Sequence, residues 1–337
     1  MRVIRCCASG GLDSLALCDE PRPRPPEPGE LTVRIEASSL NFHDYAVVTG
    51  MVGPREGLVP MADAAGTVEA VGPGVTDFSP GDAVVSLFFP EWRDRRATGH
   101  GFDTVPGDGV DGYARAHVTV PASRFTRAPR GWTAQESATL PTAGLTAWRS
   151  VAMERPVGEG DTVLVLGTGA VSLFAMQIAL WRGARVFALS SDPAKRDRLL
   201  GMGAEAVGDY RADPDWGRTV RSWTQGRGVD LVVDVAGGPG LAQSVEACAV
   251  GGDVHLIGVL DGFSGDIPLT GIINRQVRVT GLTVGSARAQ EDMIAALEDS
   301  PIRPIIDTDF ALDDIAEAFA HLASGRHFGK ITLTIGA

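Results

Sequence analysis

Hydrophobic and polar positions alternate through the first third of the chain. Every second residue from Leu31 to Ala37 is hydrophobic, which is the period of a half-buried strand. Turns rich in Gly, Pro and Asp separate this strand from the strands that follow. The further strands are predicted at Ala65–Val71, Ala83–Phe88 and Ala114–Val120. Short strands with frequent turns predict an all-β, barrel-like unit.

The pattern changes after Pro121, where helical periods begin to alternate with short apolar runs. Helices are predicted at Ala134–Thr139, Thr142–Met153, Pro193–Met202, Leu241–Val250, Ala289–Asp299 and Leu312–Ser324. Strands are predicted at Val229–Val235, Val254–Gly258, Val277–Leu282 and Lys330–Ile335. This alternation predicts a parallel sheet covered by helices on both faces. We expect the last strand to return to the first domain.

The stretch from Asp161 to Asp192 has the order strand (Thr162–Leu166), glycine turn, helix (to about Trp181), strand (Arg185–Leu189). The turn, Gly167-Thr168-Gly169, leads into a helix that begins with Ala170 and Val171. The unpaired N–H groups and positive dipole end of such a helix suit a pyrophosphate, so the pattern predicts a dinucleotide site. Ser172 stands where the fingerprint has Gly or Ala, a difference of one oxygen from Ala that we expect to be tolerated. The alternative is that these glycines are only structural.

Length and composition narrow the class of protein. A chain of 337 residues favours two domains, here 1–121 completed by about 265–337, and 122–264. A net charge of −12 argues against nucleic-acid binding, and no apolar run is long enough to span a membrane. The start of the chain lacks a signal-peptide core, so we expect a cytoplasmic protein. The cysteines, at positions 6, 7, 18 and 248, support neither a zinc site nor a disulfide framework.

The end of the second strand of this stretch bears on the choice of cofactor. An NAD enzyme usually carries an acid there, whereas this chain has Ser190-Ser191. Asp192 is either that acid displaced or, before Pro193, a helix N-cap, which we favour. Small hydroxyls followed by Lys195 and Arg196 suit a 2′-phosphate, although both basic residues also fit a solvated helix face.

Several motifs in order resemble those of the medium-chain dehydrogenases/reductases, and within them the zinc-free quinone-oxidoreductase-like branch. The matching segments cover essentially the whole chain: Pro28–Gly50, Asp63–Val75, Asp111–Pro121, Leu140–Trp148, Gly158–Ala179, Asp234–Gly240 and Phe328–Gly336. The resemblance implies an α/β protein with a Rossmann doubly wound parallel sheet and a GroES-like β-barrel domain built from both chain ends. It also implies an active-site cleft between the domains.

The resemblance bears directly on zinc. Metal-using relatives carry Cys where this chain has Asn41, and Gly-His-Glu where it has Met61-Ala62-Asp63. Asparagine and alanine cannot replace thiolate and imidazole as zinc ligands, so we expect no metal. Zinc-free relatives reduce quinones or activated alkenes rather than oxidise alcohols reversibly.

Further cofactor contacts are implied by the resemblance. Tyr210 matches a tyrosine that approaches the 2′-phosphate in NADPH-dependent relatives, which makes NADPH the expected cofactor. The residues expected beside the nicotinamide or its ribose are Thr142, Gly237, Gly258, Val259, Leu260 and Lys330. Thr142 also fits a helix surface, and a lysine that opens a strand is more often exposed.

The cleft-facing segment of the family aligns with Asn41–Tyr45. Asn41 is a candidate to bond the substrate carbonyl and Tyr45 to donate a proton, unless solvent supplies it. Asp44 is a third candidate. The alternatives are that Asn41 fixes a turn and Asp44 caps the following segment; His43 has no assigned direction.

The leading hypothesis is an NADPH-dependent quinone reductase that acts on a small molecule. Its rivals are an enone or enoyl reductase and a protein that binds NADPH without turnover. A homodimer is expected through the edge strand candidate Val277–Leu282, although a strand buried within one subunit explains the same residues. Pro90–Gly112 shows no period and is predicted to be a loop, either a functional lid or plain surface.

Overall fold

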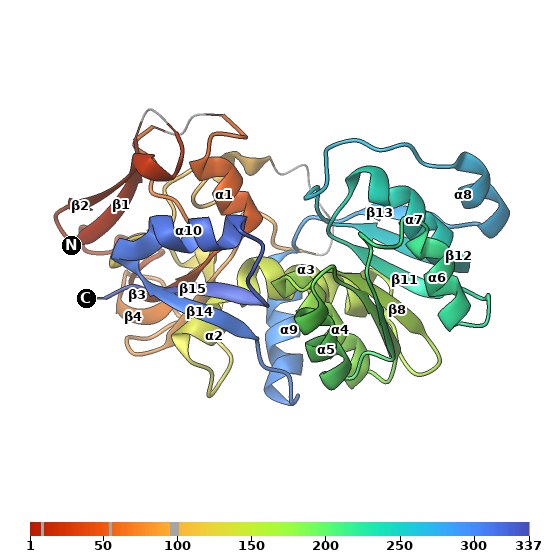
Figure 1. Cartoon of the computed structure of the whole chain (residues 1–337). Coiled ribbons are helices and arrows are strands. Elements are labelled where there is room, and N and C mark those ends of the chain that lie inside the picture. The colour runs from red at the N-terminus through yellow and green to blue at the C-terminus, as the bar shows by residue number, and fades with distance from the viewer. Residues whose placement is uncertain (8–9, 54–55, 95–100, 337) are drawn as a thin grey trace. The chain divides into compact units, whose positions relative to one another are not determined.

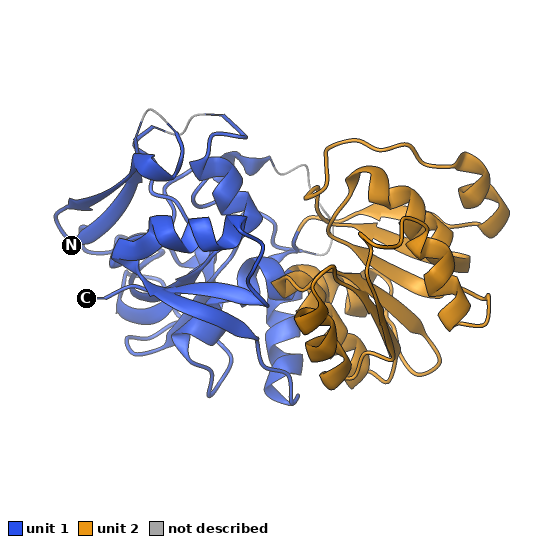
Figure 2. Cartoon of the chain, viewed as in Figure 1, with its two compact units in different colours: residues 1–145, 284–337 blue, residues 146–283 orange. Residues whose placement is uncertain are grey.

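The computed structural model describes residues 1–7, 10–53, 56–94 and 101–336 (Figure 1). The chain forms two compact units (Figure 2). Unit 1 comprises Met1–Leu145 and Val284–Ala337, and unit 2 comprises Thr146–Thr283. The predicted boundaries lie earlier in the chain, after residues 121 and 264. Residues 95–100 of the predicted 90–112 loop lie outside the described part of the chain.

Unit 2, whose residues are all described, contains a six-stranded parallel sheet in the order β10-β9-β8-β11-β12-β13. The strands are β8 (Thr162–Leu166), β9 (Arg185–Leu189), β10 (Ala206–Gly208), β11 (Val229–Asp234), β12 (Cys248–Leu256) and β13 (Arg278–Gly281). Counted from β8 as the first strand, this is the 3-2-1-4-5-6 order of a Rossmann sheet. The predicted doubly wound fold is confirmed.

Every residue of β8 and β11 is buried, which shows that the helices cover these central strands. The helices of unit 2 are α4 (Ala170–Trp181), α5 (Pro193–Gly201), α6 (Trp216–Trp223), α7 (Leu241–Ala247) and α8 (Leu269–Arg275). The predicted helix Leu241–Val250 is too long: the backbone becomes extended at Cys248, where β12 begins. β13 lies at the sheet edge, with Val279 37% exposed, as the edge-strand prediction for Val277–Leu282 expects, and the alternative of a buried strand is wrong.

Unit 1 is built around a sheet in the order β14-β15-β3-β4-β5-β7, with β6 also paired to β3, among the residues described. The strands are β3 (Glu30–Ser39), β4 (Ala65–Val71), β5 (Ala83–Ser86), β6 (His117–Pro121), β7 (Phe125–Arg127), β14 (Ile306–Ala311) and β15 (Lys330–Thr334). β1 (Arg2–Cys6) and β2 (Leu15–Asp19) form a separate antiparallel pair. β15 pairs antiparallel with β3, so the last strand returns to the first domain as expected. The predicted strand Ala114–Val120 begins later, at His117.

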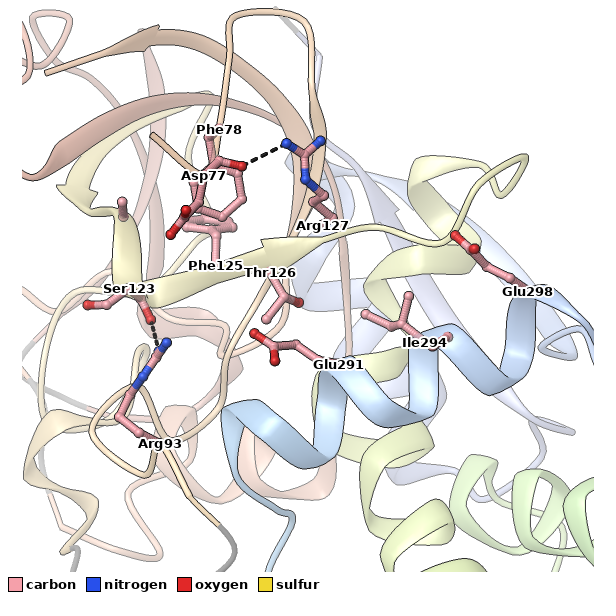
Figure 3. Close-up of a pocket in the computed structure, with 12 residues that line it drawn as sticks. Asp77, Phe78, Arg93, Ser123, Phe125, Thr126, Arg127, Glu291, Ile294 and Glu298 are labelled. Carbon is pink, nitrogen blue, oxygen red and sulfur yellow. Dashed lines mark hydrogen bonds between the residues drawn. The ribbon is translucent and has the colours of Figure 1, made fainter. Parts of the chain in front are cut away.

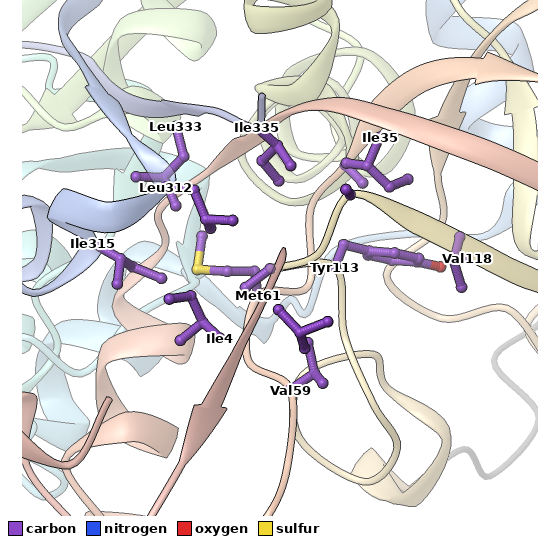
Figure 4. Close-up of a cluster of buried hydrophobic side chains, with 14 of the residues drawn as sticks. Ile4, Ile35, Val59, Met61, Tyr113, Val118, Leu312, Ile315, Leu333 and Ile335 are labelled. Atoms are coloured by element: carbon purple, nitrogen blue, oxygen red, sulfur yellow. The ribbon is translucent and has the colours of Figure 1, made fainter. Parts of the chain in front are cut away.

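Four helices complete this unit in the described part of the chain: α1 (Phe42–Val48), α2 (Ala134–Ala138), α9 (Ala287–Glu298) and α10 (Ile315–Ala323). The alternating residues of β3 face a core formed with β15 and α10. Met61 lies in this core among Ile4, Leu312 and Ile315 (Figure 4). The core therefore joins both ends of the chain.

The predicted helix Thr142–Met153 has mixed geometry. Wide π-helical turns at Leu140–Gly144 and Arg149–Glu154 flank α3 (Leu145–Trp148). Pro141 has no N–H to donate, which favours an irregular start. Such π-turns are often associated with functional sites.

No helix among the described residues is long and apolar enough to cross a membrane.

Candidate functional site

The glycine turn after β8 leaves the first turn of α4 open. Gly167 has a φ of 75°, and a Cβ added at Gly167 or Gly169 would meet no atom within 4 Å. Gly169 is the N-cap of α4 and provides no side-chain cap. The amides that begin the helix, at Ala170 and Val171, therefore face a space that a pyrophosphate fits.

Ser172, the irregular position of the fingerprint, is fully buried. Its hydroxyl donates to the carbonyl oxygen of Leu166 at 2.6 Å, at the end of β8. The extra oxygen thus has a partner, and the expected tolerance is confirmed.

A second turn follows β11, on the other side of the point where the strand order reverses. The buried carboxylate of Asp234 accepts from the N–H groups of Ala236 and Gly237, each at 2.9 Å, and from Ser244 Oγ at 2.7 Å. Burial raises the pKa of Asp234, and these three donors oppose the rise.

The predicted nicotinamide contacts Gly237 and Gly258 lie side by side. A Cβ on Gly237 would come within 2.7 Å of the Gly258 carbonyl oxygen. Gly237 also has a φ of 62°, so both conformation and space require glycine there. Val259 and Leu260 continue this turn, and Leu260 is 57% exposed.

Ser191 and Tyr210 meet at the ends of β9 and β10. Their hydroxyl oxygens are 3.5 Å apart, and Tyr210 is 40% exposed. Ser190 beside them is buried and bonds the N–H of Asp192 through its hydroxyl. Asp192 caps α5 by accepting from the Lys195 N–H at 3.1 Å, which confirms the predicted N-cap.

The basic residues of this region divide their roles. Arg196 donates to the Ser190 carbonyl at 2.8 Å and to Asp209 at 2.9 Å, so it joins two strand ends rather than forming a solvated helix face. The N–H of Ala212 is the main cause that lowers the pKa of Asp209. Arg211 lies 5.9 Å from the centre of the Tyr210 ring. This arginine was not predicted, because its position depends on the turn after β10.

A buried polar network lies in unit 1, around Lys330. Its ammonium donates to Asn41 Oδ1 at 2.6 Å and to the Leu40 carbonyl at 2.7 Å, and lies 3.5 Å from Asp63 Oδ2. Lys330 is only 2% exposed, so the alternative of an exposed lysine is wrong. The ammonium is held because carbonyl, amide and carboxylate oxygens surround it.

Asp63 is the acceptor that links the network. It is fully buried and accepts from Asn41 Nδ2 at 2.9 Å, Ser39 Oγ at 2.9 Å and Thr142 Oγ1 at 2.6 Å. Thr142 is therefore directed at a carboxylate in this structure. Sequence reasoning considered Asp63 only as a departure from the zinc motif and did not identify Ser39.

Asp44 forms a capping box with Asn41 at the start of α1. Its Oδ2 accepts from the Asn41 N–H at 2.8 Å and from Asn41 Nδ2 at 3.0 Å, and its Oδ1 from the Ala62 N–H at 2.8 Å. The capping alternative for Asp44 is thus what the structure contains. Asn41 in turn connects Asp44, Asp63 and Lys330.

The electrostatics of the network follow from its burial. Burial lowers the pKa of Lys330, and the carboxylates of Asp63 and Asp44 oppose this shift. Burial raises the pKa of Asp44, with the charge of Asp63 adding to the rise and Lys330 among the groups that oppose it. Each charge therefore depends on the others for its stability.

Tyr45 lies apart from these contacts. Its half-buried ring packs against the core of unit 1, with centroids 6.0 Å from Phe42 and 6.4 Å from Phe319.

An open pocket of about 500 Å³ lies elsewhere in unit 1, between β7 and α9 (Figure 3). Phe125, Ile294 and Ala295 give it an apolar part, and Arg127 donates to the Asp77 carbonyl at 2.7 Å at its rim. None of the predicted site residues lines it.

Within the described ranges, no three His, Cys, Asp or Glu side chains form a group able to hold a metal ion.

Two family models match the chain. One, described as an alcohol dehydrogenase GroES-like domain, matches residues 27–130, and the other, described as a zinc-binding dehydrogenase, matches residues 170–299. The chain is 35% identical over 333 residues to the zinc-type alcohol dehydrogenase-like protein C1773.06c of Schizosaccharomyces pombe, a match that covers 96% of each protein.

Solved structures of the same architecture include proteins with different cofactors. An NAD-dependent alcohol dehydrogenase is 33% identical with a TM-score of 0.90, and all of both chains is covered. Mycobacterial Rv1454c complexed with NADPH is 28% identical with a TM-score of 0.82, and a mycobacterial quinone oxidoreductase is 29% identical with a TM-score of 0.81, each with 99% of both chains covered.

A Rossmann unit with an open glycine turn and a GroES-like unit define an oxidoreductase that uses a nicotinamide cofactor. The chain belongs to the medium-chain dehydrogenase/reductase superfamily.

Replacing Lys330 with Met is expected to destabilise the protein by about 3–5 kcal/mol, because two buried carboxylates lose their cation. Urea unfolding, followed by circular dichroism, measures the change. The chain has one other lysine, half-buried Lys195, and Lys195→Met is the matched control, with an expected change within about 0.5 kcal/mol. Equal stability of wild type and Lys330→Met would contradict the stabilising role of the Lys330 ammonium in the network.

An amine-acetylating reagent gives an independent measurement. We expect it to modify Lys195 in the folded protein and Lys330 only after unfolding, because Lys330 is almost fully buried. Mass spectrometry of the digested protein separates the two sites. Rapid acetylation of Lys330 in the folded protein would show that its ammonium is not enclosed.

Proposed function

We propose that the protein is a zinc-independent, NADPH-dependent reductase that transfers a hydride to a quinone. The observation that carries this proposal is the Lys330–Asn41–Asp63 network, which stands where metal-using relatives carry their zinc ligands. Asn41 Oδ1 accepts from an ammonium and Ala62 offers no ligand, so the residues present do not fit a zinc ion. The reaction therefore proceeds without a metal-bound alkoxide.

The residues of unit 2 fit a nicotinamide dinucleotide. The open amides after Gly169 suit the pyrophosphate, and the Asp234-anchored turn offers a rigid, glycine-lined surface for the nicotinamide. When bound, the reduced cofactor supplies the hydride. The protein's part is to fix the turns and keep these surfaces in one conformation.

NADPH is favoured over NADH by the group around Ser191 and Tyr210. Two hydroxyls 3.5 Å apart can both donate to a phosphate, and Arg211 lies beside the tyrosine ring. Asp192, the nearest acid in sequence, is engaged as the cap of α5 and does not replace the acid of an NAD site. The NADPH complex of a similar mycobacterial protein supports this choice, whereas the NAD-dependent relative makes a direct comparison of the cofactors necessary.

A quinone is favoured as acceptor because the proposed site lacks a Lewis acid. Quinones accept hydride readily without metal activation, and the similarity to a mycobacterial quinone oxidoreductase points the same way. The second candidate is an α,β-unsaturated carbonyl, whose reduction uses the same hydride.

We also propose a homodimer that joins β13 edges. Arg278 and Gly281 are exposed along this edge strand. Four apolar side chains in the segment that precedes β13, which includes α8, are also exposed: Leu260, Phe263, Leu269 and Ile273. A second copy that pairs with the edge would continue the parallel sheet's hydrogen bonding and cover apolar surface.

Purified protein is expected to consume NADPH with quinones, at a higher kcat/KM than with NADH, and without loss of rate after treatment with a chelator. Absorbance of the reduced nicotinamide follows consumption across quinones, enones and enoyl thioesters. Reaction with enones alone would replace the quinone assignment. Binding without consumption of any acceptor would make the protein a non-catalytic NADPH binder.

The variant Ser191→Asp is expected to lower kcat/KM for NADPH at least about tenfold, equivalent to about 1.4 kcal/mol, because a carboxylate would face the 2′-phosphate. The rate with NADH is expected to stay constant or rise. Ser191→Ala, which removes the hydroxyl without adding charge, is the control and should cost less. An equal loss with both cofactors would place the 2′-phosphate elsewhere.

The variant Val279→Lys is expected to convert the dimer to a monomer, since a charge on the edge strand opposes strand pairing. Light scattering measures the mass of both. Val250, 69% exposed on β12, provides the matched control Val250→Lys, which should remain dimeric. A wild-type monomer would refute the proposed dimer.

A further inference from the structure

An aromatic cluster lies beside the Lys330 network and is formed by residues that take no part in that network. His43 on α1 stacks on Phe102, with ring centroids 5.4 Å apart and planes at 23°. The edge of Phe88 meets the same imidazole at 5.2 Å and 72°. Phe89 packs against both phenylalanines, at 4.7 and 5.7 Å. The imidazole of His43 therefore packs against two phenylalanine rings, which a third phenylalanine supports.

A carboxylate faces the imidazole from the loop before β6. Asp108 Oδ2 lies 3.4 Å from His43 Nε2, and the Asp108 side chain is 4% exposed. The loop is fixed by close backbone contacts: a Cβ on Gly107 would come within 2.7 Å of the Met61 backbone, and Gly107 has a φ of 76°. Asp108 is thus presented to His43 by a rigid loop.

One side of this cluster is accessible to solvent. The His43 side chain is 20% exposed, and Phe102 is 45% exposed. An accessible aromatic face next to a histidine–carboxylate pair combines a stacking surface for a planar ring with an imidazole that can hydrogen-bond a substrate oxygen. Reduction of a quinone can use both, a face for the ring and a proton donor for its oxygen.

We propose that His43 is a catalytic residue that bonds the quinone oxygen and protonates it, with Asp108 as its positioning residue and Phe102 as the stacking face for the ring. This inference rests on the proposed quinone reduction. The Asp108 carboxylate lies 3.4 Å from the buried Nε2 without a hydrogen bond to it, so it orients the imidazole by charge and leaves Nδ1 as the nitrogen that exchanges the proton.

The step balances in atoms and electrons. Hydride addition brings two electrons and one hydrogen to the quinone and leaves one of its oxygens as an anion. The His43 N–H bond then breaks as the O–H bond of the hydroquinone forms, and the imidazole regains a proton from water. The sum is quinone, NADPH and one proton giving hydroquinone and NADP⁺.

The test replaces His43 with Phe, which retains a ring for stacking and removes the proton donor. We expect kcat with 1,4-naphthoquinone to fall about 100-fold, while KM for NADPH stays constant. Phe102→Leu is expected to raise KM for the quinone with little change in kcat. Asp108→Asn should lower kcat less than His43→Phe, because the imidazole remains.

The matched control is His321→Phe. His321 pairs with Asp307 at 2.8 Å and its side chain is 22% exposed, so it resembles His43 in its partner and burial but lies on α10, away from the cluster. Wild-type kcat is expected for this variant. His43→Ala with added imidazole tests for chemical rescue, and recovery of kcat supports proton transfer at this position. If imidazole does not restore kcat, and kcat of His43→Phe does not fall selectively, the inference is overturned.

Quinone binding is measured separately, without cofactor. Trp92 lies 6.0 Å from Phe89, so naphthoquinone bound at Phe102 should quench tryptophan fluorescence, and Trp92→Phe should remove that quenching. Wild-type turnover with unchanged kcat in His43→Phe would overturn the inference and leave the proposed function intact. No turnover by wild type would refute the proposed function and the catalytic role, and unchanged quenching in Phe102→Leu would then also refute the stacking face.

Discussion

The structure of unit 1 depends on one buried ammonium. Lys330, on the last strand, donates to oxygens of Leu40 and Asn41 and balances Asp63, residues that lie between 267 and 290 positions earlier in the chain. Burying a charge is costly unless it is paired and hydrogen-bonded, so this contact requires β15, α1 and the segment before β4 to be in place together. The same contact includes Asn41 and Asp63, two positions where the resemblance places Cys and Glu in metal-using relatives. Local stability and the proposed zinc-independent chemistry therefore depend on the same group, because one fixed internal charge holds Asn41 and Asp63 in place.

Sequence patterns predicted the strands with strong local signals and did less well where tertiary contacts decide. β4, β8 and β9 have the predicted bounds, because each is a short buried or alternating run bounded by turn residues. β14 and α8 were not predicted, since their residues are largely exposed or half-buried and carry little periodic signal. The predicted helix after Thr142 exists as a helical segment, but its π-helical turns depend on how the segment packs and not on its composition.

The candidate site shows the same division. The glycine turn and the cap at Asp192 were identified from sequence because backbone turns leave glycine and capping signatures, whereas Tyr210 was named from the family resemblance and its contact with Ser191 was not predicted. The network residues Asn41, Asp44, Thr142 and Lys330 were each named, yet with separate roles, and their joint dependence on Asp63 was not foreseen. Hydrogen bonds between residues 79 to 289 positions apart cannot be deduced from local spacing. Asp108 and Phe102 were missed for the same reason, since their loop has no period and acquires its shape from Met61 and Gly107.

This contrast explains why the cofactor can be inferred more readily than the substrate. The dinucleotide surfaces of unit 2 are made largely of backbone: amides after Gly169, and a turn whose N–H groups are held by Asp234. Because these glycines and this acid fix the backbone, they fix the dinucleotide-binding surface as well. The cofactor site can therefore be recognised from a short sequence motif. The surface proposed for the quinone is made of side chains, with His43, Phe102 and Asp108 drawn from separate segments. A single substitution there changes the shape, polarity or proton supply of the surface without disturbing the fold. Substrate choice in this chain therefore rests on individual side-chain contacts, and it has to be derived from the structure residue by residue.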